Sequence, residues 1–398
     1  MVASRTAQRL LERDRLQSGV WTGLVVYVGD TAWDGNQFVS QHVAKRLAER
    51  TPVLYVDPPI SRLSALRRPA LAQSLSEARL RMVGPGLARL TPVVPPGVSR
   101  PVMRDIATTL VRRNIRRAVD VLGAQPKAII VGGVLPVLDA LPRAQKIFYA
   151  TDDFSAAGDL MGMGSGWVQH QVRRLTTSAD QVLTVSENFA EKCRKQGINS
   201  VFVPNGCDVR FLSTVDSAPL PTDVTVTGPV AGFVGHLSSR IDIGCLEAIA
   251  DRGLSLALVG PRQFSFDKAR IDPLLARPNV QWVGAKPFAE LPSYLRAIDV
   301  GLVPYADTDF NRASFPLKTL EYLAAGRGVV STDLPATRWL DTDLISIAGT
   351  AEEFAGAVER ALATPDTAEQ RAARRAFAER HSWERRVDQI ADVLGLTT

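Results

Sequence analysis

The sequence predicts an α/β fold of two doubly wound, Rossmann-like domains that face each other across a cleft. Two observations support this prediction. Short, continuously apolar strands alternate with amphipathic helical segments, which is typical of a parallel sheet with helices on both faces. The alternation then occurs a second time, after a segment at residues 212–228 that is rich in Pro, Thr, Ser and Asp. A chain of 398 residues is long enough to give each half its own core.

The first half contains five predicted strands. They cover residues 24–28, 53–56, 128–131, 146–150 and 181–185. Apolar residues at helical spacing over 39–47 predict a helix between the first two strands. The segment 201–208 closes this half, because its Asn-Gly pair marks a turn. We therefore expect a first domain over residues 1–211 and a linker over residues 212–228.

The second half repeats the pattern with five more predicted strands. They cover residues 230–235, 255–260, 280–284, 300–304 and 329–331. We expect a second domain over residues 229–375 and a C-terminal helix within residues 376–398. Open sheets of this kind bind ligands outside the carboxyl ends of their strands, so the cleft is the expected site.

The composition is that of a globular protein, with 45% hydrophobic and 22% charged residues. No apolar run approaches the roughly 18 residues that a membrane span needs. The N-terminus is rich in Arg and Glu and lacks the apolar core of a signal peptide, so we expect an exposed amphipathic helix there. Three cysteines without metal-type spacing favour a reducing cytoplasm. Because His and Cys clusters are lacking, we expect neither a metal ion nor another cofactor.

The net charge of +6 is unevenly distributed along the chain. Residues 1–200 carry 27 Lys and Arg against 16 Asp and Glu, which leaves 20 against 25 for the remainder. The arginine clusters that contribute most lie at residues 67–68, 79–81, 112–113 and 116–117. This split indicates either that the first half faces an anionic ligand or membrane, or that it is a solvated arginine-rich surface. Nucleic acid is not expected, because the sequence lacks interleaved aromatic residues and a recognisable binding module.

The most informative stretch runs from Ser314 to Gly326 and continues into the apolar residues 329–331. Pro316 suits the first turn of a helix, and Gly326 suits its end. The loop before this helix presents backbone N–H groups and the positive end of the helix dipole, which favours a phosphate. Glu321 lies one turn into the helix, where its carboxylate can accept two hydrogen bonds from a ribose diol. The alternative is a surface glutamate that the dipole favours near the helix start.

This stretch resembles the nucleotide-sugar site of GT-B fold glycosyltransferases, in particular those related to the retaining group-1 type. In that family two glutamates eight positions apart bracket the loop, the first facing the sugar and the second holding the ribose. Glu321 matches the second, whereas Ala313 stands at the position of the first and Pro316 at that of the loop glycine. These departures leave retention or inversion of configuration open. The further residues that the resemblance places beside the donor are Phe315, Leu317 and Lys318.

The segment from Gly235 to Arg240 follows the first strand of the second half. Gly235 lets the backbone approach a ligand closely, and Arg240 offers a planar fork of donors that suits a diphosphate. This segment resembles the family's diphosphate loop, where a basic residue neutralises the leaving nucleotide. The resemblance also places His236 beside the donor and makes Lys318 a second cation for the phosphates. The counterpart of the family's base-reading loop consists of Gly284, Ala285 and Lys286.

Acidic residues follow two strands of the first half. Asp152 and Asp153 come directly after the strand that ends at residue 150, where such sheets place catalytic groups. One of them can act as a general base, because a neighbouring like charge raises a carboxyl pKa. The alternative is a helix N-cap with an exposed neighbour. A rival acceptor-side set in the first loop consists of Asp30, Trp33 and Asp34.

The resemblance is close over residues 180–395 and weaker over residues 20–180. It implies transfer of a sugar from a nucleoside diphosphate sugar, without a metal ion, to a glycan, cell-envelope or lipid-linked acceptor. It also implies that the last helix packs on the first domain. A small-molecule acceptor such as a soluble natural product is one alternative, and an epimerase is another, because nucleotide-sugar 2-epimerases share this architecture. We expect a cytoplasmic enzyme whose basic half docks on the inner face of the membrane.

Overall fold

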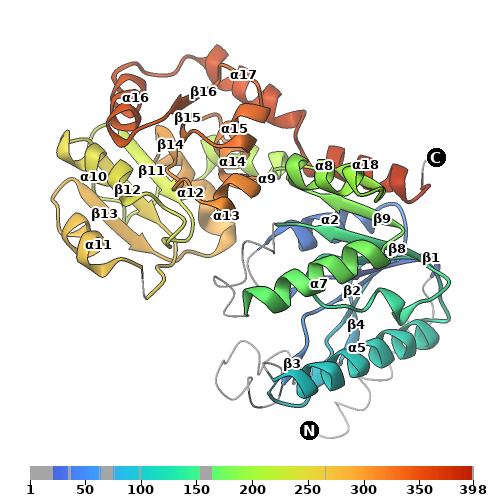
Figure 1. Ribbon diagram of the computed structural model, residues 1–398. Coiled ribbons are helices and arrows are strands. Elements are labelled where there is room, and N and C mark those ends of the chain that lie inside the picture. Colours follow the sequence, from blue (N-terminus) through green and yellow to red (C-terminus); the bar gives the residue numbers. More distant parts are fainter. Residues whose placement is uncertain are drawn as a thin grey trace, which may run out of the picture. The chain divides into compact units, whose positions relative to one another are not determined.

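The computed structural model describes residues 21–34, 37–61, 63, 75, 77–97, 100–152, 164–264 and 266–396. They form two compact units (Figure 1). Unit 1 lies within Met1–Pro204 and Arg386–Thr398, and unit 2 is Asn205–Arg385. Each is built on a sheet whose strands are largely parallel, which confirms the predicted fold class. The expected N-terminal amphipathic helix and Asp153 lie outside the described residues.

Unit 1 contains an eight-stranded sheet in the order β10-β9-β8-β7-β1-β2-β5-β4. Its strands are β1 (Thr22–Val28), β2 (Val53–Val56), β4 (Leu80–Gly84), β5 (Leu87–Leu90), β7 (Gln125–Val131), β8 (Gln145–Ala150), β9 (Gln181–Thr184) and β10 (Ser200–Phe202). All neighbours are parallel except β4 and β5. A separate two-stranded sheet pairs β3 (Ile60–Ser61) with β6 (Val93–Val94). The chain runs from β1 outward to β2 on one side and to β7 on the other, so the topological switch point lies at the carboxyl ends of β1 and β7.

The five strands predicted in the first half are confirmed as β1, β2, β7, β8 and β9. The sequence did not reveal β4 and β5, because Arg81 and Arg89 interrupt their apolar patterns. The two strands form an antiparallel pair at one edge of the sheet, where continuous apolar character is not required.

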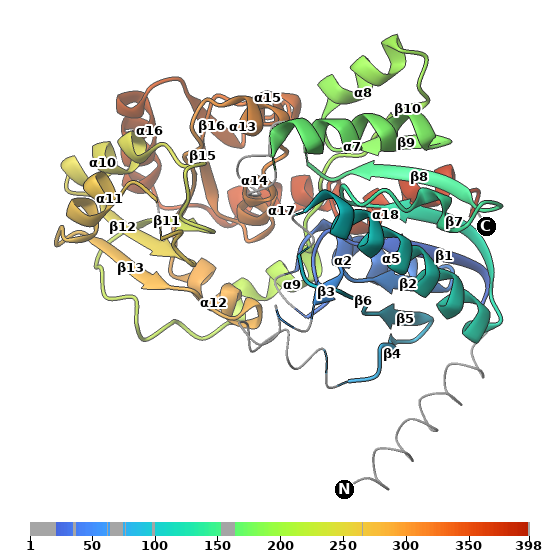
Figure 2. The ribbon, with the colours of Figure 1, turned by 60° about the horizontal axis from the view of Figure 1, so that its bottom comes forward.

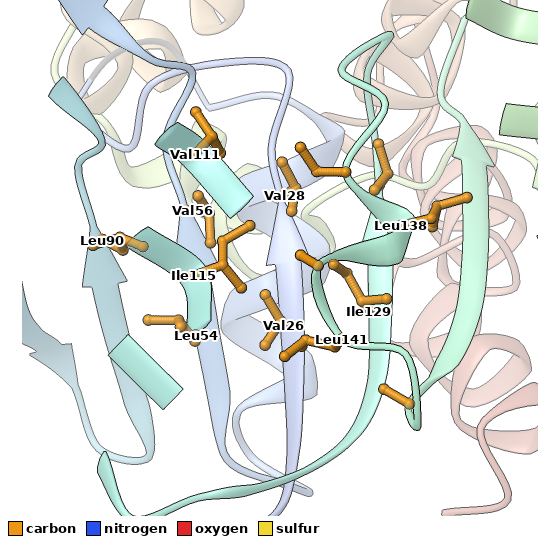
Figure 3. Close-up of a cluster of buried hydrophobic side chains, with 14 of the residues drawn as sticks. Val26, Val28, Leu54, Val56, Leu90, Val111, Ile115, Ile129, Leu138 and Leu141 are labelled. Atoms are coloured by element: carbon orange, nitrogen blue, oxygen red, sulfur yellow. The ribbon is translucent and has the colours of Figure 1, made fainter. Parts of the chain in front are cut away.

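The helices of unit 1 surround this sheet. In the described residues before Pro204 they are α2 (Val39–Leu47), α5 (Pro101–Leu122), α7 (Ser165–Ser178), α8 (Glu187–Lys195) and the short η1 (Leu138–Ala140), and the last helix of the chain adds to them. Figure 2 shows α5 running across β1 and β2. Val111 and Ile115 of α5 lie against Val26, Leu54 and Val56 of these strands, and all five side chains are fully buried (Figure 3). Each contributes about 1.5–3 kcal/mol of burial free energy, so α5 anchors the core of unit 1.

Unit 2 contains a six-stranded, fully parallel sheet in the order β13-β12-β11-β14-β15-β16. Its strands are β11 (Val230–Val234), β12 (Ser255–Val259), β13 (Val280–Gly284), β14 (Val300–Val303), β15 (Gly328–Thr332) and β16 (Ile345–Ala348). The five predicted strands are confirmed, and β16 is an addition whose two central residues are exposed. This order is that of a Rossmann sheet, and it reverses between β11 and β14.

The helices of unit 2 connect these strands. They are α10 (Ile243–Asp251), α11 (Lys268–Leu275), η3 (Phe288–Glu290), α12 (Leu291–Arg296), α13 (Asp309–Ala313), α14 (Leu317–Ala324), α15 (Pro335–Trp339), α16 (Ala351–Ala363) and α17 (Ala368–Glu379). The helix predicted after Pro316 is confirmed as α14. Its Tyr322 lies so close to β14 that a Cβ at Gly301 would approach the ring within 2.2 Å. The Tyr322 hydroxyl accepts a hydrogen bond of 2.8 Å from the N–H of Val234, which fixes α14 against the centre of the sheet.

The boundaries between the two units lie at other positions than the domain boundaries that the sequence predicted. The first division lies between Pro204 and Asn205, whereas the sequence placed it at residue 211. Within the expected linker, α9 (Val209–Leu212) and η2 (Ser213–Ser217) belong to unit 2, where Asp216 pairs with Arg375. A polar composition hid these short helices, because it is equally typical of an unstructured connection.

The chain returns to unit 1 within its last helix, α18 (Trp383–Val393). Lys127 Nζ donates to the carbonyl of Gly395 over 2.8 Å, and Gln145 Nε2 donates to that of Val393 over 3.2 Å. Arg50 also forms an ion pair with Asp388. The part of the chain after Arg385 therefore completes unit 1. None of the helices in the described part of the chain combines the length and apolar character needed to cross a membrane.

Candidate functional site

The switch point of unit 2 brings together the loops that follow β11 and β14. The N–H of Ala306 donates to the carbonyl of Arg240, and the N–H of Asp242 donates to that of Pro304, each over 2.8 Å. The predicted diphosphate loop from Gly235 to Arg240 therefore lies where sheets of this order bind their ligands.

A close backbone contact shapes the base of this loop. Gly260 follows β12 with φ of +138°, and a Cβ there would lie 1.9 Å from the carbonyl oxygen of Gly235. Only glycine fits such an approach. On the other side, the position of a Cβ on Gly235 lies 3.4 Å from Cε of Lys318. Gly235 and Lys318, both predicted as site residues, are thus brought together, whereas Gly260 was not predicted.

Arg240 is held on three sides. Its Cζ lies 4.8 Å from the ring centroids of both Tyr305 and Phe310, and its Nε donates to Oδ1 of Asn311 over 2.9 Å. Among the described residues, no carboxylate forms an ion pair with this guanidinium. A partly buried cation of this kind is suited to an anionic ligand. Arg240 was predicted as a site residue, whereas Tyr305, Phe310 and Asn311, which hold it, were not.

Lys318 and Glu321 form an ion pair on the first turns of α14. Nζ of Lys318 lies 2.7 Å from Oε2 of Glu321, and about a quarter of each side chain is exposed (22% and 26%). Burial lowers the pKa of Lys318, but the carboxylate of Glu321 and the nearby Tyr305 outweigh it, so the pKa is raised. The ammonium of Lys318 is therefore charged at neutral pH. No side chain caps the start of α14, where Pro316 is the N-cap residue, so its first N–H groups suit a phosphate.

The loop before α14 is fixed by Asn205, which was not predicted as a site residue. Asn205 Nδ2 donates to the carbonyl of Phe315 over 2.8 Å, and both residues are buried. Leu317 is half-buried in the first turn of α14. The sequence Asn205-Gly206 was interpreted only as a turn. A contact between Asn205 and a residue 110 positions away leaves no local sequence pattern.

The expected base-reading loop lies at the end of β13. The carbonyl of Gly284 accepts a 2.8 Å hydrogen bond from the N–H of Gly260, which joins this loop to the one after β12. Lys286 forms an ion pair with Asp223 and lies over the ring of Tyr294 at 5.1 Å. Its ammonium therefore anchors the chain before β11, and the loop offers mainly the backbone around Ala285.

His236 is an exposed residue of the diphosphate loop. Partial burial of its ring lowers the pKa of His236, so the imidazole is neutral at pH 7. It can donate or accept one hydrogen bond but adds no positive charge. The structure thus assigns the cationic character of this end of the sheet to Arg240 and Lys318.

The switch point of unit 1 contains Asp30. Ser40 Oγ donates to Oδ1 of Asp30 over 2.5 Å, and Thr151 Oγ1 lies 3.5 Å from Oδ2. Burial raises the pKa of Asp30, although these hydroxyls partly offset the effect. A Cβ at Gly133 would lie 3.3 Å from that of Asp30, so the end of β7 also closes around the carboxyl group. A carboxyl with a raised pKa at a switch point is a candidate proton acceptor.

A buried ion pair supports the rest of this loop. Asp57, at the end of β2, accepts hydrogen bonds from the N–H of Trp33 over 2.9 Å and from Nε of Arg89 over 2.6 Å. Arg89 also pairs with Asp34, whose side chain is 56% exposed. Asp34 is therefore not an isolated carboxylate but the outer end of a charged network. Asp57 and Arg89 were not predicted as site residues, because neither stands in a recognisable motif.

The two rival sets of acidic residues lie on the same sheet edge. Asp152 follows β8 and is partly buried. The hydroxyl of its neighbour Thr151 donates to the carbonyl of Gly132 over 3.0 Å and lies beside Asp30. Asp30 and the start of the Asp152 segment are thus brought together. In the described part of the chain, no group of three or more His, Cys, Asp or Glu side chains is placed to hold a metal ion.

The arginines of α5 fall into two groups. Arg112 donates to the carbonyl of Pro136 over 2.6 Å and pairs with Asp139, and Arg116 donates to the carbonyl of Ala140 over 2.8 Å. These two arginines therefore fix η1 rather than forming a ligand surface. Arg113 and Arg117 are exposed, as is Arg116, but among the described residues no such contact with η1 is found for Arg113 or Arg117.

Known proteins similar to this chain in sequence or fold include glycosyltransferases. Residues 228–364 match the family Glycosyl transferases group 1, and this match covers the sheet of unit 2. The resemblance to group-1 glycosyltransferases is thereby confirmed over residues 228–364, and the solved structures described next share the GT-B fold of the chain.

The relatives include a protein named as the teichuronic acid biosynthesis glycosyltransferase TuaH of Bacillus subtilis (strain 168). It is 33% identical over 174 residues, which cover 41% of this chain and 43% of TuaH, so the match spans less than half of each. Among solved structures, sucrose-phosphate synthase of Thermosynechococcus elongatus has a TM-score of 0.70 at 14% identity, over 93% of this chain and 98% of that one. HepE of Anabaena in complex with UDP has a TM-score of 0.62 at 16% identity, over 94% and 100%. These structures share the fold with this chain.

Proposed function

We propose that the protein transfers a sugar from a nucleoside diphosphate sugar, bound by unit 2, to a hydroxyl of an acceptor. One observation carries this proposal: Arg240, Lys318 and Glu321 gather at the switch point of a Rossmann-type sheet. Two cations next to the uncapped start of α14 suit a diphosphate, and a carboxylate one turn further on suits a ribose diol.

In this proposal the diphosphate takes over the interactions of Lys318. In the structure, Nζ of Lys318 lies 2.7 Å from Oε2 of Glu321. A bound diphosphate competes for the ammonium, which leaves the carboxylate of Glu321 to accept hydrogen bonds from the ribose. As the bond to the sugar breaks, charge accumulates on the leaving diphosphate, and Arg240 and Lys318 stabilise it. These protein charges do the work of a metal ion, so transfer should not require one.

The acceptor is activated in unit 1. Asp30 or Asp152 accepts the proton of the acceptor hydroxyl, whose oxygen then bonds to the anomeric carbon of the sugar. The raised pKa of Asp30 favours it as the proton acceptor. Trp33 and Asp34, held by Asp57 and Arg89, contribute to binding the acceptor.

The relatives favour a UDP-sugar and a glycan acceptor. HepE is described in complex with UDP, and TuaH is named for the biosynthesis of teichuronic acid. A cell-envelope polysaccharide or its lipid-linked precursor is therefore the proposed acceptor. Sucrose-phosphate synthase, by its name, makes a sugar phosphate, so a small soluble acceptor is the alternative. For a lipid-linked acceptor, Arg113 and Arg117 of α5 are proposed to face the anionic membrane.

A nucleotide-sugar assay tests the proposal. The protein is incubated with UDP-, GDP-, ADP- and dTDP-sugars, with and without a glycan acceptor, and the released diphosphate and the sugar are both analysed. Acceptor-dependent release of diphosphate supports a transferase. Conversion of the sugar without release indicates an epimerase instead. Addition of EDTA should leave the rate unchanged, and a loss of rate would contradict the metal-independent mechanism.

A further inference from the structure

We propose that Asn311 is a positioning residue that fixes the guanidinium of Arg240 in the orientation needed to bind the diphosphate of the donor. This inference rests on the proposed donor site and adds a residue to it. Asn311 belongs to α13, which directly follows the β14 loop at the switch point. Its side chain is buried, with 1% of the residue exposed.

The side-chain amide of Asn311 uses both of its ends to hold Arg240. Oδ1 accepts a 2.9 Å hydrogen bond from Nε of Arg240, and Nδ2 donates to the carbonyl of the same residue over 2.9 Å. Nδ2 also donates to the carbonyl of Ala306 over 2.9 Å. One side chain thus links the backbone of the diphosphate loop, the guanidinium of Arg240 and the loop after β14. A buried amide with these partners leaves little freedom for the arginine.

The contacts of Arg240 determine which of its donors remain available. The ring centroids of Tyr305 and Phe310 lie 4.8 Å from Cζ of Arg240, and its Nε donates a hydrogen bond to Asn311. The terminal Nη1 and Nη2 groups are the remaining donors. They form the planar fork that binds two oxygen atoms of a phosphate. Because the fork is fixed before the ligand arrives, less conformational entropy is lost on binding.

The choice of asparagine preserves the charge of the arginine. Lys318 is paired with Glu321, and Lys286 is paired with Asp223. Arg240 has no carboxylate partner among the described residues and is held by a neutral amide. An aspartate at 311 would have almost the same shape but would neutralise the guanidinium, and it would lose the Nδ2 donor to two carbonyls. The geometry therefore points to a site that orients a cation while keeping its charge for the ligand.

The test compares nucleotides that differ in their phosphates. Calorimetry with UDP, GDP, ADP and dTDP first identifies the nucleoside diphosphate that binds the wild-type protein, and its nucleoside monophosphate is then measured alongside. Asn311→Ala and Asn311→Asp should weaken binding of the diphosphate about tenfold or more, which corresponds to the loss of the fixed charged contact. Binding of the monophosphate should change less, because the second phosphate is absent.

A matched control and a double variant make the result specific. Asn279 is another partly buried asparagine of unit 2, and its Nδ2 donates to the carbonyls of Ala250 and Leu254 at the opposite end of the strands. Asn279→Ala should leave the binding of both nucleotides unchanged. In an Arg240→Ala background, Asn311→Ala should cause no further loss, because its effect acts through the arginine.

The outcomes separate this inference from the proposed function. If Glu321→Ala weakens diphosphate binding but neither Asn311 variant does, the donor site stands and the positioning role is refuted. An equal loss for diphosphate and monophosphate, or an undiminished effect in the Arg240→Ala background, would show a general structural role and also refute it. If the wild-type protein binds none of the four nucleotides, the proposed donor site and this inference both fail.

Discussion

Replacement of Glu321 is the sharpest test of the donor site. In the structure its carboxylate holds the ammonium of Lys318 at 2.7 Å. In the proposed complex it instead accepts two hydrogen bonds from the ribose diol. Glu321→Ala removes both the ion pair with Lys318 and the hydrogen bonds to the ribose. Nucleotide affinity and protein stability should therefore fall by different amounts.

The expected loss of nucleotide affinity is the strength of the ribose hydrogen bonds less the cost of releasing the Lys318–Glu321 ion pair. A hydrogen bond to a charged group contributes about 1.5–3 kcal/mol, so two of them contribute roughly 3–6 kcal/mol. Release of the ion pair with Lys318 costs about 1 kcal/mol, because both side chains are about a quarter exposed. The net loss of affinity is roughly 2–5 kcal/mol, or about 30- to 5,000-fold in Kd. The loss of stability should be only about 1 kcal/mol, the value of the partly exposed pair.

Isothermal calorimetry and denaturant unfolding measure these two quantities. Glu359→Ala is a matched control, because Glu359 is also a helical glutamate of unit 2 that pairs with an arginine, Arg252. Its removal should leave nucleotide affinity unchanged. Glu321→Gln keeps the shape and should retain part of the affinity. An unchanged Kd for Glu321→Ala with an intact fold would refute the assignment of this residue to the ribose.

Three further predictions concern other parts of the molecule. Asp30→Asn should abolish transfer yet raise the free energy of unfolding at neutral pH, because burial raises the folded-state pKa of Asp30. The contribution of Asp30 to stability falls as the pH rises from its unfolded pKa through its folded pKa, and asparagine removes that loss. Lower stability of the variant at pH 7 in denaturant unfolding would contradict this. Reversing the charges of Arg113 and Arg117 should weaken binding to anionic vesicles by roughly 1 kcal/mol per residue in co-sedimentation, without affecting neutral vesicles or nucleotide binding. Arg112→Glu should mainly lower the melting temperature, because that side chain fixes η1. Equal, negligible binding of the wild-type protein to both vesicle types would refute the membrane surface. Lys286→Ala should leave nucleotide affinity unchanged in calorimetry, because its ammonium is engaged by Asp223; a clear loss would show that it reaches the donor.

The sequence predicted the parallel strands well, because each carries its signal locally. A run such as residues 128–131 is apolar throughout, since both faces of the sheet are covered. The antiparallel edge was missed, because Arg89 lies in β5 and finds its partner Asp57 at the end of another strand. Burial of a charge depends on that distant partner, so no local pattern reveals it.

The candidate site shows the same division between local and distant information. Glu321 and Arg240 were found because each stands at a recognisable distance from a strand or helix end. The residues that hold the site in place were not, because Asn205 and Asn311 act across sequence separations of 110 and 71 residues. A side chain that positions another has no motif of its own when its partner lies so far along the chain.

The substitution at position 313 changes the charge of the proposed donor site. In the resembled family a glutamate stands there, and here Ala313 ends α13. Among the residues proposed to bind the donor, the charged side chains are Arg240 and Lys318 against Glu321, an excess of one positive charge. With a second carboxylate that excess would vanish, and the diphosphate would lose part of its attraction. Ala313→Glu should therefore weaken binding of the nucleoside diphosphate and make it less sensitive to salt, whereas Ala313→Gln, of similar size and without charge, should do neither. Equal effects of the two substitutions in calorimetry at low and moderate salt would show that bulk rather than charge matters at this position.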